Sequence, residues 1–87
     1  MDDKLKSDAS RGVKAKRLLN DELLVEAFST IRQNLLLGYQ ASKSDQADER
    51  EQIYFTLKAL KSVEDYLGST LRNGEFAIKT LEEMNNE

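Results

Sequence analysis

The sequence predicts an all-α protein built around an antiparallel helical hairpin, and three observations predict it. The 87 residues include no proline and only four scattered glycines, whereas all-β and loop-rich folds need many turns. Apolar residues recur at steps of three and four over two long segments, which is the spacing of one helix face. A short polar segment, residues 41–45, separates these two segments, and short connections favour antiparallel neighbouring helices.

The first long helix is predicted over residues 21–40. Asn20 can accept a hydrogen bond from an orphan backbone amide of the first turn. Asp21 and Glu22 place negative charge at the positive end of the helix dipole. The helix should therefore begin directly after Asn20.

The second long helix is predicted over residues 46–72, with Ser44 or Asp45 as its cap. One apolar stripe on each long helix should face the other and hold the hairpin together. The predicted hairpin core is Leu24, Phe28, Ile31, Leu35, Ile53, Leu57, Leu60 and Leu67.

Two glycines in the C-terminal half carry structural information. Gly68 lies inside the second helix and is either a tolerated surface glycine or a point where another backbone approaches closely. Asn73-Gly74 predicts a helix stop, because glycine readily adopts the left-handed conformation that ends helices. A short third helix over residues 75–85 should follow.

Three aromatic residues of the second helix lie outside the hairpin stripe: Tyr54, Phe55 and Tyr66. A hairpin contact buries only one stripe per helix, and small single cores without disulfides or metals are weakly stable. We therefore expect the chain to form a homo-oligomer, with these aromatics as contacts between subunits. The alternative is a monomeric three-helix bundle.

Charge divides the chain into two predicted domains. Residues 1–19 carry six basic and three acidic side chains, whereas residues 20–87 carry seven basic and thirteen acidic ones. The first segment is predicted to be a flexible, disordered basic arm, in which residues 13–19 could form a short helical lead-in. The second is predicted to be the helical hairpin oligomerisation domain.

Four residues of the arm are candidates for contacts with nucleic-acid phosphates: Arg11, Lys14, Lys16 and Arg17. A solvated tail that aids solubility is the alternative interpretation. Several arms on one oligomer would bind together more strongly than one arm alone.

Composition argues against an enzyme. The chain has no histidine and no cysteine, so the commonest general base and the thiolate nucleophile are absent. Its glycines form no phosphate-binding loop. We expect a non-enzymatic protein with no catalytic residues, metal site, cofactor or small-molecule substrate.

The sequence also predicts a cytoplasmic protein. No apolar run is longer than Leu35–Leu37, which is far too short to cross a membrane, so no membrane partner is expected. The N-terminal residues do not resemble a signal peptide.

Short leucine and charge motifs give the chain a family resemblance over residues 18–82. The motifs are Leu23-Leu24, Glu26-Ala27-Phe28, Glu49-Arg50-Glu51, Lys58-Ala59-Leu60 and Gly74-Glu75-Phe76-Ala77. In this pattern the chain resembles small phage and prophage helical-hairpin proteins, which are similar to the oligomerisation core of small terminase subunits. It departs from complete small terminases, since residues 1–19 are too short for their N-terminal helix-turn-helix domain.

The resemblance implies a ring component of bacteriophage DNA packaging. Such an adaptor would recruit double-stranded DNA, the packaging ATPase or both, in the host cell cytoplasm. The alternative is a small helical module that binds and regulates a host or phage protein.

Overall fold

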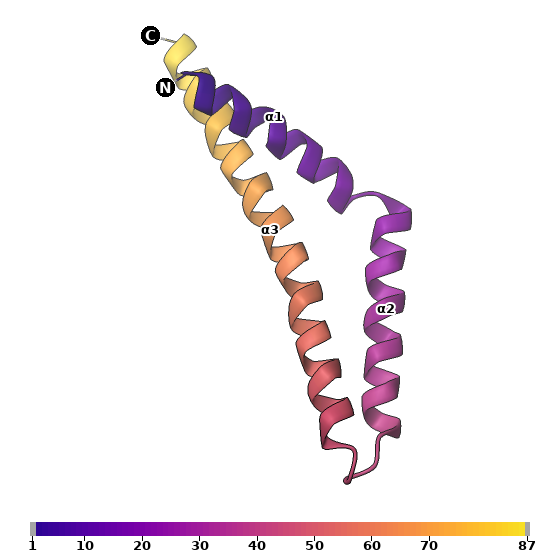
Figure 1. Cartoon of the computed structure of the whole chain (residues 1–87). Coiled ribbons are helices and arrows are strands. Elements are labelled where there is room, and N and C mark those ends of the chain that lie inside the picture. Colours follow the sequence, from indigo (N-terminus) through magenta and orange to yellow (C-terminus); the bar gives the residue numbers. More distant parts are fainter. Residues whose placement is uncertain (1, 87) are drawn as a thin grey trace.

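Three α-helices make up residues 2–86, the part of the chain that this computed structural model describes. They are α1 (Asp2–Leu19), α2 (Glu22–Ala41) and α3 (Ala47–Asn85), and these residues include no β-strand. The all-α prediction is therefore confirmed. Met1 and Glu87, the outermost residues of the two predicted domains, lie outside the described residues. Figure 1 shows α3 as the long axis of the molecule, with α1 beside its C-terminal half and α2 beside its N-terminal half.

Residues 2–19 form a helix, although the sequence predicted a disordered basic arm there. Asp2 and Asp3 in the first turn and Lys16 and Arg17 in the last turn complement the helix dipole. One face of α1 carries short side chains at helical spacing and lies against α3. The residues of this face that are buried are Gly12 and Ala15. Residues 2–19 are thus packed against α3. The net charge of this segment, on which the prediction rested, carries no information about the face of small residues that makes the contact.

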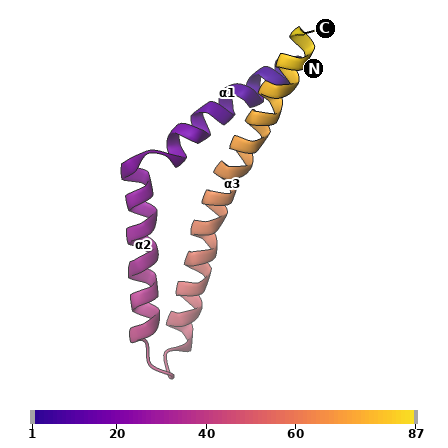
Figure 2. The same cartoon turned by 180° about the vertical axis from the view of Figure 1, so that it is seen from behind.

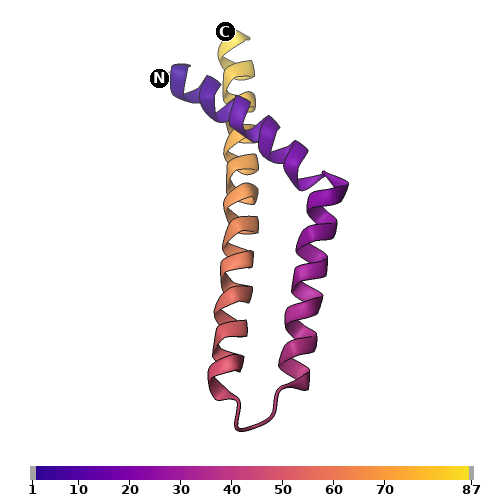
Figure 3. The ribbon, with the colours of Figure 1, turned by 45° about the vertical axis from the view of Figure 1, so that its right-hand side comes forward.

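The contact between α1 and α3 is a backbone-to-backbone crossing of two glycines. A Cβ atom placed on Gly12 would lie 2.5 Å from the Cα atom of Gly74. A Cβ atom placed on Gly74 would lie 2.9 Å from the carbonyl oxygen of Asp8. Ala15 and Ala77 flank the crossing and are 2% and 0% exposed. Figure 3 shows α1 passing obliquely over the upper half of α3.

The predicted helix stop at Asn73-Gly74 is wrong, and so is the separate third helix over residues 75–85. α3 continues without a break from Ala47 to Asn85. No glycine among the described residues has a positive φ, so Gly74 adopts no helix-ending conformation. Its missing side chain instead makes room for α1. The close backbone approach that the sequence allowed at Gly68 occurs at Gly74.

α2 begins one residue later than predicted, and its cap is a different residue. Asp21 is the N-cap, and its side chain accepts a hydrogen bond of 2.9 Å from the backbone amide of Leu24. Asn20 instead donates its side-chain amide to the carbonyl oxygen of Lys16, at the end of α1. The link between α1 and α2 therefore ends one helix and starts the next within two residues, Asn20 and Asp21.

Side-chain hydrogen bonds of Ser42, Gln46 and Arg50 close the loop between α2 and α3. Gln46 is the N-cap of α3 and makes no side-chain capping bond, so the predicted caps Ser44 and Asp45 are wrong. Arg50 donates from Nε to the hydroxyl of Ser42 at 2.7 Å. Its guanidinium also lies 5.5 Å from the ring centroid of Tyr39. These contacts fix the turn between the two helices.

The molecule is extended rather than compact. Its extents are 65 × 24 × 14 Å, and its radius of gyration is 18.6 Å. A compact domain of this length has a radius of gyration of about 12 Å. α1 packs against α3 much more extensively than α2 does. The view from behind shows the same open arrangement (Figure 2).

Because of the glycine crossing, alanine substitutions at Gly74 and Gly68 of α3 should change the free energy of unfolding in opposite directions. Gly74→Ala should lower the free energy of unfolding by about 1–2 kcal/mol, because overpacking against the backbone of Gly12 outweighs the gain in helix propensity. Gly68→Ala is the matched control. Its Cβ would meet only the flexible end of Arg72 at 3.4 Å, so it should stabilise by up to about 1 kcal/mol.

The measurement is chemical denaturation of both variants at one fixed protein concentration. If Gly74→Ala stabilised the chain as much as Gly68→Ala does, the crossing would not be tight.

Candidate interaction surfaces

The predicted hairpin core is only half-buried. Seven of its eight residues have intermediate exposure, and the eighth, Ile31, is 46% exposed. No residue of α2 is buried. The contact between α2 and α3 therefore leaves much of both stripes accessible, and the buried residues of α3 are instead Gly74 and Ala77, at the crossing with α1.

An ion pair links the middle of α2 to the middle of α3. Arg32 donates to the carboxylate of Glu64, and the two side chains are 42% and 35% exposed. Next to this pair, an apolar recess of about 150 Å³ opens where the end of α1 meets the start of α2. Its apolar lining consists of Leu18, Leu19, Leu24, Val25 and Phe28.

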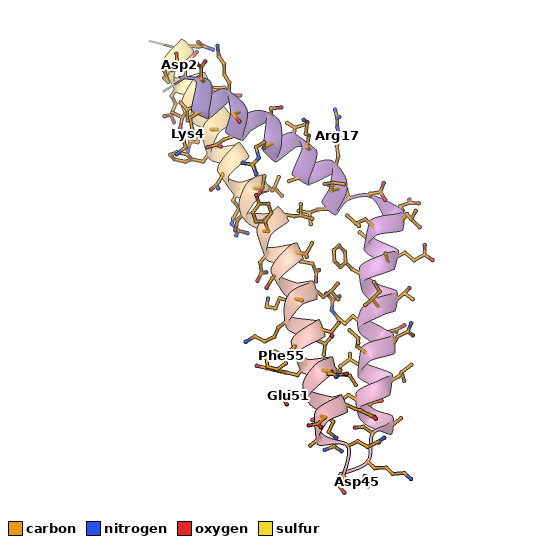
Figure 4. The ribbon with its side chains drawn as sticks, in the orientation of Figure 1. Asp2, Lys4, Arg17, Asp45, Glu51 and Phe55 are labelled. Carbon is orange, nitrogen blue, oxygen red and sulfur yellow. The ribbon has the colours of Figure 1, made fainter. Side chains whose placement is uncertain are left out.

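The three aromatics predicted as subunit contacts are all exposed. Tyr54, Phe55 and Tyr66 are 54%, 57% and 63% exposed. Phe55 and Tyr66 are eleven residues apart and so share a face of α3, whereas Tyr54 lies on another face. Figure 4 shows Phe55 pointing away from α2. The ring of Tyr54 meets Phe55 edge-on and is covered by the ammonium of Lys58, 5.4 Å from its centroid.

The structure separates the four predicted phosphate contacts. Arg11 is held against α3, because its guanidinium donates to the hydroxyl of Tyr66 at 2.9 Å. Lys16 borders the shallow recess beside Gly12. Lys14 and Arg17 share the outer face of α1, and Figure 4 shows Arg17 directed away from α3. All four side chains are exposed.

Sequence reasoning missed Lys6, a basic residue on the same outer face of α1 as Lys14 and Arg17. Lys6 precedes Lys14 by eight residues and Arg17 by eleven, so helical spacing places the three on one side of α1. The spacing can be read from the sequence, but it places these residues on one face only if residues 2–19 are helical. A basic strip on α1 thus consists of Lys6, Lys14 and Arg17.

Sequence reasoning also missed the exposed apolar side of α2. Between Ala27 and Ser42 the only charged residue is Arg32, which is paired with Glu64. Large apolar side chains are nevertheless open to solvent near the end of this helix. They are Leu36, Leu37 and Tyr39, at 45%, 62% and 47% exposure. Such a helix has the composition of a buried element.

Within residues 2–86, no group of three or more acidic side chains is placed to hold a metal ion. None of the three helices combines the length and apolar character that crossing a membrane requires.

Comparison with known proteins gives no relative for this chain: no family model, no curated protein and no solved structure matches it.

Proposed function

We propose that this chain is a non-enzymatic assembly protein that acts as a homo-oligomer. The observation that carries the proposal is its exposed area of 7000 Å². A compact monomer of this mass exposes about 5200 Å². The excess of about 1800 Å² per chain is enough for interfaces of the size found in permanent homodimers, about 2000–5000 Å² in total.

The composition of the exposed surface indicates that the large exposed area reflects self-association rather than a merely elongated monomer. Leu23, Leu37, Tyr66 and Phe76 are all more than 60% exposed, and they come from both α2 and α3. Aromatic side chains such as Tyr66 and Phe76 are enriched at interfaces between proteins. Association of copies would cover these side chains without the disulfide or metal that small isolated domains often need.

Within this proposal, the chain serves as an adaptor in bacteriophage DNA packaging, in the host cell cytoplasm. The resemblance to the oligomerisation core of small terminase subunits suggests this role. The basic strip of Lys6, Lys14 and Arg17 supports a contact with double-stranded DNA, since phosphates attract such exposed cations. An oligomer would repeat the strip once per subunit and present the remaining faces to a packaging ATPase.

A second candidate function is a helical module that captures and regulates another protein. The apolar recess between α1 and α2 favours it, because a recess lined by Leu18, Leu24 and Phe28 could receive an apolar side chain of a partner. This function requires a monomer or simple dimer, whereas the adaptor requires a larger assembly.

Native mass separates the two functions. We expect sedimentation velocity at micromolar concentration and physiological salt to give a discrete oligomer. A mass of six to twelve chains would support the packaging ring. A dimer would keep self-association and favour the partner-binding module, and a monomer at all accessible concentrations would contradict the proposal of a homo-oligomer.

Replacing the basic strip of Lys6, Lys14 and Arg17 by alanine should abolish DNA retention while the oligomer keeps its mass. Each lost phosphate contact should lower the slope of log affinity against log salt by about 0.9. The measurement is fluorescence anisotropy with a double-stranded DNA fragment over a series of salt concentrations. The control is the triple variant Lys43→Ala, Lys61→Ala and Lys79→Ala, which removes positive charge outside α1. Equal loss in both variants would contradict a specific role for α1.

A further inference from the structure

One face of α3 carries an exposed stripe with a symmetric sequence. Phe55, Ala59, Ser62 and Tyr66 follow one another at steps of four, three and four. The order is large, small, small, large, and it reads the same in both directions. All four residues are exposed. We call these four residues the α3 stripe.

The charged residues along one edge of the α3 stripe form a second symmetric pattern. Glu51, Lys58, Asp65 and Arg72 recur every seven residues, with signs that alternate from negative to positive. All four are exposed. In heptad terms the stripe occupies core positions a and d, and these charges occupy the flanking position g. The opposite edge, position e, carries only the uncharged Thr56, Val63 and Thr70.

From these two patterns we propose that α3 pairs antiparallel with α3 of a second copy of this chain. The two-fold axis would pass between Leu60 and Lys61, the midpoint of the α3 stripe. The inference rests on the proposed self-association and specifies the face and direction of one two-fold contact; a ring of six to twelve chains would need a second, heterologous interface as well. An isologous interface of this kind requires a surface that is complementary to itself, and the stripe has that property.

The central small residues and the outer aromatics have separate roles in this pairing. Ala59 of one copy lies opposite Ser62 of the other, so the helix axes can approach closely at the two-fold axis. Phe55 of one copy lies level with Tyr66 of the other, about 8 Å from the axis along the helix at 1.5 Å per residue. There the rings fill the space that opens as crossing helices diverge.

The edge charges choose the antiparallel direction. In antiparallel coiled coils position g of one helix faces position g of the other. In this register Lys58 faces Asp65 of the other copy, and Glu51 faces Arg72, so the two-fold axis generates four attractive pairs. A parallel pairing would set position g against position e, where this helix has no charge between Thr56 and Thr70. The antiparallel arrangement reverses the order of the four charges on the second copy, so every positive charge lies opposite a negative one.

The occupant of this surface is a second copy rather than α1 of the same chain. α1 already lies on the C-terminal half of α3, where Gly12 meets Gly74. Its contact with the stripe is at the end, where Arg11 donates to the hydroxyl of Tyr66. α1 joins α2 directly through Asn20 and Asp21, so it cannot extend to Phe55. Asp65 already forms an ion pair of 3.5 Å with Lys61 of the same helix. Because both side chains are exposed, this pair is weak and competes little with the pair between Asp65 and Lys58 of the second copy.

Charge reversal tests the register. Lys58→Asp and Asp65→Lys should each weaken self-association about tenfold, because each turns two attractive pairs into two repulsive ones. The double variant should recover the original affinity, and so should an equimolar mixture of the two single variants. Lys79→Asp is the matched control: it makes the same change on α3 beyond the paired segment, and it should leave the affinity unchanged. Sedimentation equilibrium measures all five samples.

Cysteine cross-linking tests the direction, and the chain has no cysteine of its own to interfere. A mixture of Ala59→Cys and Ser62→Cys chains should form disulfide-linked dimers faster than either variant alone, and mass spectrometry should identify the mixed species. Faster linking of each variant with itself would indicate parallel helices and overturn the inference.

The outcomes distinguish this inference from the proposed function. A wild-type chain that stays monomeric overturns both. An oligomer whose affinity responds equally to Lys58→Asp and Lys79→Asp, or that the double variant does not restore, overturns the α3 pairing alone.

Discussion

The contact between the backbones of Gly12 and Gly74 is the constraint on which the rest of the structure depends. Because a Cβ on Gly12 would lie 2.5 Å from the Cα of Gly74, neither position accepts a side chain without moving a helix. The crossing holds α1 over the C-terminal half of α3 and requires α3 to remain helical through Gly74. It also sets where α2 begins, since only Asn20 and Asp21 separate α1 from α2.

The same crossing contains every residue that is buried within residues 2–86: Gly12, Ala15, Gly74 and Ala77. These are the smallest side chains, so the tightest packing contributes little apolar area, and the larger leucines and aromatics stay accessible. Burial of apolar area supplies most of the free energy that opposes the loss of chain entropy. A chain with this distribution of burial gains stability from association, and its α3 stripe is symmetric in the way that an isologous contact requires.

Periodicity in the sequence was enough to predict the all-α class and to place both ends of α2 and the start of α3 within one residue. It was insufficient where one residue type has two structural uses. Glycine at position 74 could end a helix or admit a neighbouring backbone, and the residue that decides, Gly12, lies 62 positions away in the sequence. The helix of residues 2–19 was missed for a related reason. Its packing face consists of glycine and alanine rather than leucine, so its basic charge dominated the sequence signal, and the basic strip containing Lys6 could not be recognised.

We propose that α3 has two further neighbours: α1 of the same chain covers its C-terminal half, and a second copy covers the face of its N-terminal half that α2 leaves open. Hydrogen–deuterium exchange of the full chain at two protein concentrations, well above and well below the dissociation constant, tests it most directly. We expect dilution to accelerate exchange in peptides spanning residues 55–66 and to leave exchange in residues 70–81 nearly unchanged. Exchange over residues 55–66 that is the same at both concentrations would contradict it.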